Sequence, residues 1–127
     1  MNPRDAWTLA RAWVDAWNDR DLEAVLAHYA DEVEVCSPLV VDRLGRPDGK
    51  LRGKDELRSY FARGMANPDL RFTLVDVRIG VNAICVLYDR ESGRRVADTM
   101  ELDARGRAIR MTACYAEGGG ASCSAAS

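Results

Sequence analysis

The aspartate at position 98 has an unusual place in the sequence pattern. From Val96 to Leu102 the residue types alternate, and Asp98 falls on the same side as Val96, Met100 and Leu102. Because successive side chains of a strand point to opposite faces, this pattern predicts a carboxyl group on the apolar face of a strand. Burying an unpaired carboxylate is costly, so we expect Asp98 either to have a hydrogen-bond partner or to be protonated with a raised pKa.

Two roles follow for this aspartate. A neutral carboxylic acid can donate a hydrogen bond to a carbonyl or enolate oxygen, which makes Asp98 the candidate catalytic residue. The structural alternative is that Asp98 bonds Tyr29, Tyr115 or a tryptophan N–H and ties the helices to the sheet. The residue pattern leaves both roles open.

Other kinds of site have little support in the sequence. His28 is the only histidine and no two cysteines have the CxxC spacing, which argues against a zinc site. There is no Ser-His-Asp order and no phosphate-binding glycine loop. We therefore expect no metal and no cofactor, and we expect His28 to be exposed or to interact with a helix C-terminus.

Composition sets further bounds. Hydrophobic residues make up 47% and charged residues 30% of the chain, and the net charge is −2. This balance is that of a globular protein and gives no reason to expect a nucleic-acid partner. No apolar run is long enough to cross a bilayer, so we expect no membrane partner and a cytoplasmic location. The basic stretch 42–54 is expected to be a solvated loop, with a site for an anionic ligand as the alternative.

The periodicities place Asp98 among the elements that must position it. Helical spacing predicts helices at 3–17, 22–30 and 54–66, the first with Asn2 as N-cap and Pro3 at its first position. The segment 33–41 is expected to be a strand with a kink at Pro38. Four later strands are expected at 70–80, 83–91, 95–103 and 108–116, with glycine-containing turns between the last ones.

This order predicts an α+β domain, residues 1–116, with three helices on one face of a largely antiparallel sheet. Residues 117–127 are small and polar and are expected to form a flexible C-terminal tail. The run 83–88 is apolar on both alternating faces, so the helices cannot cover all of it. We therefore expect a homodimer through the outer face of the sheet.

Several segments of this chain resemble the SnoaL-like group of the nuclear transport factor 2-like superfamily. They are WVDAWNDRDLEAVLAHYADEVEV, the dipeptide Ser37-Pro38, GKDELRSYFARGM and ADTMELDARGRAIRMTACYA, which together span most of residues 10–116. The resemblance implies a cystatin-like cone of curved mixed sheet and three helices around a pocket, in a protein that is usually dimeric. Members include ketosteroid isomerases, polyketide cyclases, limonene epoxide hydrolases and non-catalytic binding proteins, so the fold alone does not give the function.

Carrying the family's catalytic residues over gives an uneven result. Asp98 matches the protonated aspartic acid of ketosteroid isomerases and the acid/base aspartate of the cyclases. The isomerase general base, however, falls on Ser37 and its oxyanion-hole tyrosine on Trp13, so isomerase chemistry of that design is not expected. The arginine and second aspartate of the epoxide hydrolases fall on Val96 and Ala113, which leaves that reaction the least supported.

The remaining matched positions resemble the wall of a hydrophobic pocket around Asp98. The leading hypothesis is a domain that binds a hydrophobic or polycyclic small molecule and, if it is an enzyme, acts as an isomerase or cyclase by proton transfer next to a carbonyl. The alternative is a non-catalytic binding or protein-interaction domain. The expected substrate-binding residues are Trp13, Trp17, Tyr29, Ser37, Phe61, Met65, Val96, Met100, Met111 and Tyr115. Ala113 also falls on or near a lining position of the family.

Overall fold

The computed structural model describes residues 1–116, and its first helix begins where the sequence places it. Helix α1 spans Pro3–Asn18, and the side chain of Asn2 accepts a hydrogen bond of 2.8 Å from the backbone N–H of Asp5. Proline fits the first position because its missing N–H is not needed there. The helix buries one apolar stripe, which consists of Ala6, Ala10, Trp13, Val14, Ala16 and Trp17.

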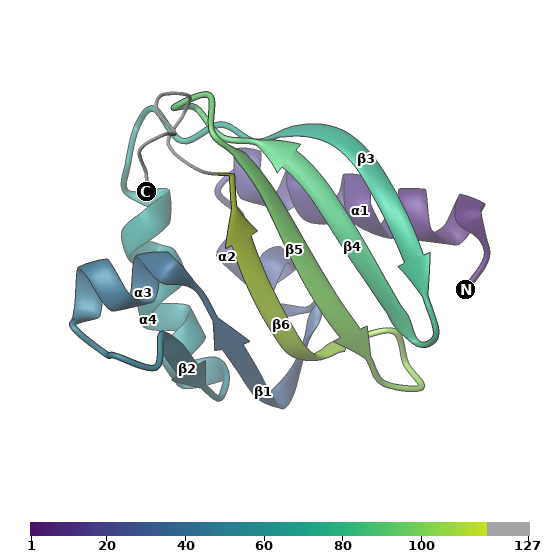
Figure 1. The fold of residues 1–127 in the computed structure, drawn as a ribbon, viewed down its shortest axis with the longest axis horizontal. Helices are drawn as coiled ribbons and strands as arrows, with labels where there is room; N and C mark the ends of the chain where they lie inside the picture. Colours follow the sequence, from purple (N-terminus) through teal and green to yellow (C-terminus); the bar gives the residue numbers. More distant parts are fainter. Residues whose placement is uncertain (117–127) are drawn as a thin grey trace.

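Six strands form one mixed sheet in the order β2-β1-β6-β5-β4-β3. Strands β1 and β6 are parallel, and every other neighbouring pair is antiparallel. The sheet curves around the helices (Figure 1), which confirms the predicted α+β class with a curved mixed sheet. The strands are β1 (Tyr29–Cys36), β2 (Lys50–Arg52), β3 (Thr73–Gly80), β4 (Ala83–Asp89), β5 (Arg95–Leu102) and β6 (Ala108–Tyr115).

Strand β5 has the alternation that the sequence predicts. Val96, Asp98, Met100 and Leu102 are all buried, and the residues between them are exposed or half-buried. The register pairs Asp98 with Val86 of β4 on one side and with Ala113 of β6 on the other. Asp98 therefore lies in the middle of the inner face of the sheet.

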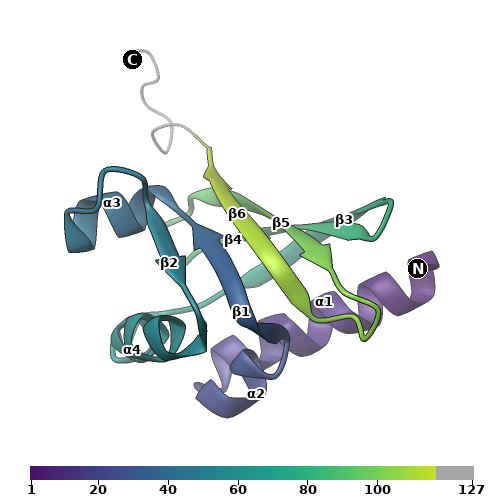
Figure 2. The same ribbon diagram turned by 90° about the horizontal axis from the view of Figure 1, so that it is seen from below.

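Helices cover this inner face. Helix α1, the short α2 (Leu22–Leu26) and α4 (Lys54–Met65) all lie on one side of the sheet (Figure 2). The opposite face of strands β3–β6 is covered by no helix of residues 1–116. The core therefore lies between the inner face and the three helices, and the outer face is left for solvent or a partner.

The segment after β1 corrects the sequence prediction. Strand β1 ends at Cys36, and a helix, α3 (Pro38–Leu44), replaces the expected kinked strand at 33–41. Pro38 occupies the first turn of α3, and the hydroxyl of Ser37 accepts a bond of 3.2 Å from the backbone N–H of Leu39. Proline is thus the start of a helix rather than a kink in a strand. The described residues contain four helices rather than three.

Two boundaries also differ. Helix α2 ends at Leu26 instead of residue 30, because β1 already begins at Tyr29 and the carbonyl of His28 accepts a 2.8 Å bond from the N–H of Ala108. The basic stretch 42–54 is not a simple loop, since it contains the end of α3 and strand β2. The predicted tail at 117–127 lies outside the described residues. None of the described helices has the length and apolar character needed to span a bilayer.

Candidate functional site

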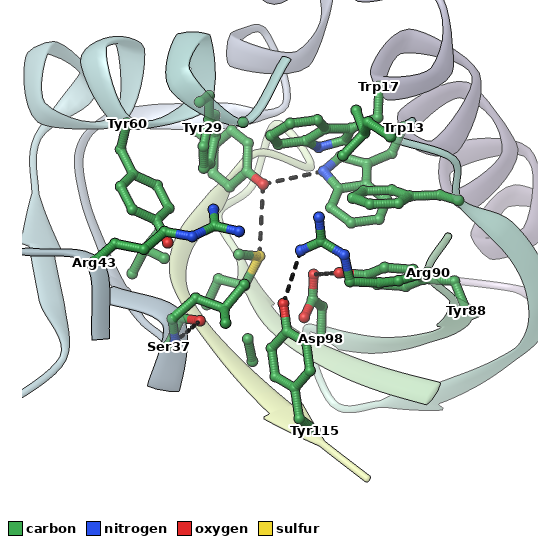
Figure 3. Close-up of a pocket in the computed structure, with 18 residues that line it drawn as sticks. Trp13, Trp17, Tyr29, Ser37, Arg43, Tyr60, Tyr88, Arg90, Asp98 and Tyr115 are labelled. Carbon is green, nitrogen blue, oxygen red and sulfur yellow. Dashed lines mark hydrogen bonds between the residues drawn. The ribbon is translucent and has the colours of Figure 1, made fainter. Parts of the chain in front are cut away.

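A cavity of about 60 Å³ lies between the inner face of the sheet and helices α1, α3 and α4. One part of its wall is aromatic and another part carries polar side chains (Figure 3). Asp98 is the one carboxylate among the described residues that line it. The lining residues are Trp13, Trp17, Tyr29, Val35, Ser37, Leu39, Arg43, Tyr60, Phe61, Gly64, Leu70, Phe72, Tyr88, Arg90, Asp98, Met111, Ala113 and Tyr115.

Asp98 is the buried acid of this cavity, with 2% of its surface exposed. Its Oδ2 accepts a hydrogen bond of 3.0 Å from the hydroxyl of Tyr88, whereas its buried Oδ1 has no partner among residues 1–116. Burial raises the pKa of Asp98 from its ordinary value of 3.8 to about 7, although the Tyr88 hydroxyl and the positive charge of Arg90 oppose the rise. Asp98 is therefore close to half-protonated near neutral pH.

The partner of Asp98 comes from the neighbouring strand. Val86 is paired with Asp98 across the β4–β5 ladder, and Tyr88 lies two residues further along β4 on the same face. Such diagonal neighbours are within reach of a long aromatic side chain. The structural alternative named Tyr29, Tyr115 or a tryptophan as the partner, and the structure instead shows Tyr88. This bond links two strands and does not tie a helix to the sheet.

Tyr29 makes the helix-to-sheet contact. Nε1 of Trp13 on α1 donates a 3.0 Å hydrogen bond to the Tyr29 hydroxyl, which in turn lies 3.5 Å from Sδ of Met111 on β6. Burial raises the pKa of Tyr29 far above its ordinary value, so this hydroxyl stays protonated. The Tyr29 hydroxyl therefore already has a donor and an acceptor inside the protein.

The aromatic wall is held by contacts between α1 and the segment before β3. The side chain of Asn18 accepts a 2.8 Å bond from the N–H of Phe72 and donates a 2.9 Å bond to its carbonyl. These bonds fix Phe72 against Trp13 and Tyr88, with ring centroids 5.8 and 4.5 Å away. Trp17 packs edge-to-face on Phe61 at 4.9 Å.

Two arginines lie at the polar part of the cavity. The side chain of Arg90, which follows β4, is 11% exposed and donates a 3.1 Å hydrogen bond to the hydroxyl of Tyr115. Its other contacts are Glu91 at 3.4 Å and the ring of Phe72 at 5.3 Å. Arg43 of α3 is exposed and reaches over the ring of Tyr60 at 5.9 Å. Figure 3 shows both guanidinium groups directed into the cavity.

The structure brings together most, but not all, of the pocket residues expected from the sequence. Met65, Val96 and Met100 do not line the cavity. Val96 and Met100 share the face of Asp98, but each lies two residues along the strand, about 7 Å away, and both are buried in the core. The expected residues that line the cavity are Trp13, Trp17, Tyr29, Ser37, Phe61, Asp98, Met111, Ala113 and Tyr115.

Half of the residues that line the cavity were not expected from the sequence. Tyr88 could have been predicted from the sequence, because it continues the alternation of Ile84 and Val86, which places its side chain on the inner face of β4. No sequence pattern pointed to Arg43 or Arg90. Arg43 lies on helix α3, a segment that was expected to be a strand and a loop, and Arg90 follows the end of strand β4. The lining residues not expected from the sequence are Val35, Leu39, Arg43, Tyr60, Gly64, Leu70, Phe72, Tyr88 and Arg90.

Ser37 lines the cavity, but its polar groups already make hydrogen bonds to nearby backbone. Its hydroxyl caps α3, and its backbone N–H donates a 2.9 Å bond to the carbonyl of Gly49. A serine hydroxyl has no basicity at neutral pH, so it cannot replace a general-base carboxylate. His28 is half-buried, burial lowers its pKa, and it does not line the cavity. Within residues 1–116 no three His, Cys, Asp or Glu side chains cluster in a way that could hold a metal ion.

Comparison with known proteins shows the family to which the chain belongs. The SnoaL-like domain family model matches residues 10–117, and this chain belongs to that family. A SnoaL-like protein from Burkholderia thailandensis is 34% identical over 91% of this chain and 98% of its own, with a TM-score of 0.88. No curated protein matches the chain significantly.

More distant structures share the fold. A protein with a cystatin-like fold from Methylobium petroleophilum has a TM-score of 0.73 and 17% identity, over 93% of this chain and 80% of its own. A nuclear transport factor 2-like protein from Burkholderia pseudomallei has a TM-score of 0.70 and 21% identity, over 91% and 92% of the two chains. These relationships establish the nuclear transport factor 2-like, cystatin-like fold.

The arrangement supports one kind of acid–base chemistry. A carboxyl group with a pKa of about 7 can donate a proton when neutral and accept one when ionised. Its Oδ1 has no hydrogen-bond partner among residues 1–116, whereas Oδ2 is held by Tyr88. The second carboxylate that a water-activating site needs is not among the described lining residues.

Proposed function

We propose that this domain binds a small, largely apolar molecule that carries a carbonyl group, and that Asp98 exchanges a proton with it. The observation that carries the proposal is that Asp98 lines the cavity and that its buried Oδ1 has no partner among residues 1–116. A buried polar atom without a partner is costly, and a ligand that supplies one removes this cost.

The protonation of Asp98 fits this role. In its neutral form the group donates a hydrogen bond from Oδ1 to a carbonyl oxygen. In its ionised form it removes a proton from the carbon next to the carbonyl, which gives an enolate and the neutral acid. If the acid first exchanges this proton with solvent and returns a solvent proton to the same carbon, the reaction is an exchange. If the ketone is β,γ-unsaturated, the acid can instead return the proton to the γ-carbon of the dienolate, which shifts the double bond and is an isomerisation without a cofactor. A pKa of about 7 keeps both forms present at neutral pH.

The size of the cavity limits the ligand. Ligand pockets usually measure about 300–1,000 Å³, and this cavity measures about 60 Å³. A molecule of a few heavy atoms fits without rearrangement, whereas a polycyclic ligand must displace lining side chains. Arg43 is the lining side chain best placed to move, because it is exposed and forms no ion pair with another described residue.

A binding domain without turnover is the second candidate. It is favoured by the absence of another acid or base of suitable pKa among the described lining residues, and by the bond from Tyr88 that already satisfies half of the carboxyl group. In this case Asp98 only donates a hydrogen bond to the carbonyl. The two candidates differ in whether protons next to the carbonyl exchange with solvent.

Cyclohexanone in D₂O separates them. We expect the wild-type protein to bind this ketone and to accelerate the loss of its α-proton signals in proton NMR. Asp98→Asn should lower the exchange rate at least about 100-fold, in the range of general acid–base catalysis. Asp15→Asn, which changes an exposed acid of α1 outside the cavity, should exchange like wild type.

Each result decides between the candidates. Binding without exchange would support the domain that only binds. A failure of cyclohexanone and of larger ketones to bind at millimolar concentration would overturn the proposed function in both forms.

We also propose that a second copy of the chain covers the outer face of the sheet. Cys85 and Leu87 of β4 and Ala97 of β5 are half-buried on that face, where no helix of residues 1–116 covers them. Ion pairs join Asp89 to Arg95 and Glu101 to Arg110 near these residues. An apolar strip with charged groups around it is the usual composition of a protein interface.

A further inference from the structure

The polar part of the cavity has more positive charge and more hydrogen-bond donors than the protein itself uses. Arg43 and Arg90 are the charged bases among the described lining residues, and Asp98 is the acid. Because the pKa of Asp98 is about 7, the lining residues carry a net charge between +1 and +2 at neutral pH, and Glu91, which lies 3.4 Å from Arg90, offsets part of it. An arginine keeps its charge at every physiological pH.

The arginine donors are incompletely paired. Arg43 makes no ion pair within residues 1–116, and its guanidinium group lies over the ring of Tyr60 at 5.9 Å and close enough to the Tyr60 hydroxyl to act on its pKa. Arg90 contacts Glu91 at 3.4 Å and Tyr115 at 3.1 Å. Its side chain is only 11% exposed, so water can satisfy few of its remaining donors. A guanidinium group has five N–H donors, so both arginines have donors to spare.

Two further donors at the cavity are buried and unpaired. Nε1 of Trp17 and the hydroxyl of Tyr60 have no acceptor for their protons among the described residues, although the Arg43 guanidinium group lies beside the Tyr60 hydroxyl as a donor. Burial raises the pKa of Tyr60, so its hydroxyl keeps its proton. Buried donors without acceptors are rare in folded proteins. A molecule with several acceptor oxygens would satisfy them together with the arginines.

Resting on the proposed function, we infer that the ligand is an oxo acid, whose carboxylate lies between Arg43 and Arg90 while its carbonyl group meets Asp98. The planar fork of a guanidinium group matches the two oxygens of a carboxylate. The hydroxyl of Tyr60 lies on the same part of the wall as Arg43 (Figure 3). The apolar part of the ligand lies against Trp17, Phe61 and Phe72.

A pair of matched ligands tests this inference. The probes are 4-oxocyclohexanecarboxylate and its neutral amide, 4-oxocyclohexanecarboxamide, which share the ketone and differ in charge. At pH 6, where Asp98 is mostly protonated, calorimetry should show wild type binding the carboxylate about 10- to 100-fold more tightly than the amide, the range for a charged hydrogen bond. Arg43→Gln and Arg90→Gln should each remove most of this preference.

Arg105→Gln is the control, because it removes the same charge from an exposed turn outside the cavity, and it should keep the preference. Arg43→Gln keeps the test decisive if Arg90→Gln does not fold, since Arg43 is exposed. Equal binding of both probes by wild type, with binding still dependent on Asp98, would overturn the carboxylate inference and leave the proposed function standing. Preference for the carboxylate with no effect of Asp98→Ala, which removes the hydrogen-bond donor that an asparagine would keep, would overturn the proposed function and support the anion site. Binding of neither probe by a protein that binds cyclohexanone would overturn the carboxylate inference alone, and failure of cyclohexanone as well would overturn both.

Discussion

The hydroxyl of Tyr88 donates a 3.0 Å hydrogen bond to Oδ2 of Asp98, and both residues are buried on the inner face of the sheet. The bond orients the carboxyl group so that one oxygen is held by the protein, and the other oxygen has no partner among residues 1–116. It also favours the ionised form of Asp98, which partly offsets the effect of burial on its pKa. The pair therefore sets both the direction and the protonation of the proposed functional group.

The first prediction concerns stability and pH. Burial raises the pKa of Asp98 from 3.8 to about 7 in the folded chain, so its contribution to stability is fully present below about pH 4 and is lost as the pH rises through about 7. From pH 5 to pH 8, wild type should lose about 3 kcal/mol of unfolding free energy relative to Asp98→Asn. Urea unfolding of both proteins at several pH values measures this difference.

The groups that face Asp98 do not titrate in this range. Tyr88 and Tyr115 have raised pKa values, chiefly because of burial, and Arg90 stays charged. Asp15→Asn is the control and should follow wild type across the whole range. Parallel pH profiles for wild type and Asp98→Asn would contradict the raised pKa.

The second prediction compares two tyrosine hydroxyls of the cavity wall. Tyr29→Phe removes the acceptor of the buried Trp13 N–H and should lower the unfolding free energy by about 1–3 kcal/mol. Tyr60→Phe removes a hydroxyl that has no acceptor among the described residues and whose neighbouring donor, Arg43, is exposed to solvent, so it should change stability by less than about 0.5 kcal/mol. Chemical denaturation of the two variants gives both values. Equal losses would show that the Tyr60 hydroxyl has a partner in the free protein.

The third prediction concerns the backbone behind Ser37. Gly45 and Gly49 have nearly the same positive φ, +66° and +67°, but a Cβ at Gly49 would lie 2.9 Å from the carbonyl oxygen of Ser37, whereas one at Gly45 meets nothing within 4 Å. Gly45→Ala should cost about 1 kcal/mol for its backbone conformation. Gly49→Ala should cost at least about 1 kcal/mol more, because the chain next to α3 must shift. Thermal unfolding of both variants measures the difference, and equal losses would contradict the close approach.

The fourth prediction concerns ligand binding and pH. As the pH rises from 6 to 8, Asp98 gains a negative charge and the net positive charge of the cavity falls. The affinity for 4-oxocyclohexanecarboxylate should therefore decrease several-fold, while that for the neutral amide changes less. Calorimetric titrations at the two pH values measure both affinities. In Asp98→Asn the carboxylate should bind with the same affinity at both pH values, and a persisting decrease would assign the effect to another group.

The fifth prediction concerns the outer face of the sheet. Leu87→Glu places a charge in the middle of the proposed interface and should convert a homodimer into a monomer, because an unpaired charge is costly to bury. Ala62→Glu, on the exposed side of α4, should leave the dimer intact. Light scattering at micromolar concentration gives the mass in each case. A wild-type protein with the mass of one chain would contradict the proposed dimer.

The sequence by itself determined the features that depend on neighbouring residues. The start of α1 follows from Asn2 and Pro3, the four later strands follow from alternation, and the burial of Asp98 follows from its place between Val96 and Met100. Each of these is a local pattern, because the period of a strand or helix relates residues only a few positions apart. Pro38 was ambiguous at this level, since proline is compatible with both a strand kink and a helix start.

Only the tertiary structure decided which side chains meet across the cavity. Tyr88 reaches Asp98 because β4 and β5 pair in one register, and Arg43 faces Arg90 because α3 packs beside the end of the sheet. Met65, Val96 and Met100 lie outside the cavity for the same reason, although their patterns resemble those of the lining residues. Contacts between distant segments depend on how whole elements pack, and no local periodicity encodes that packing.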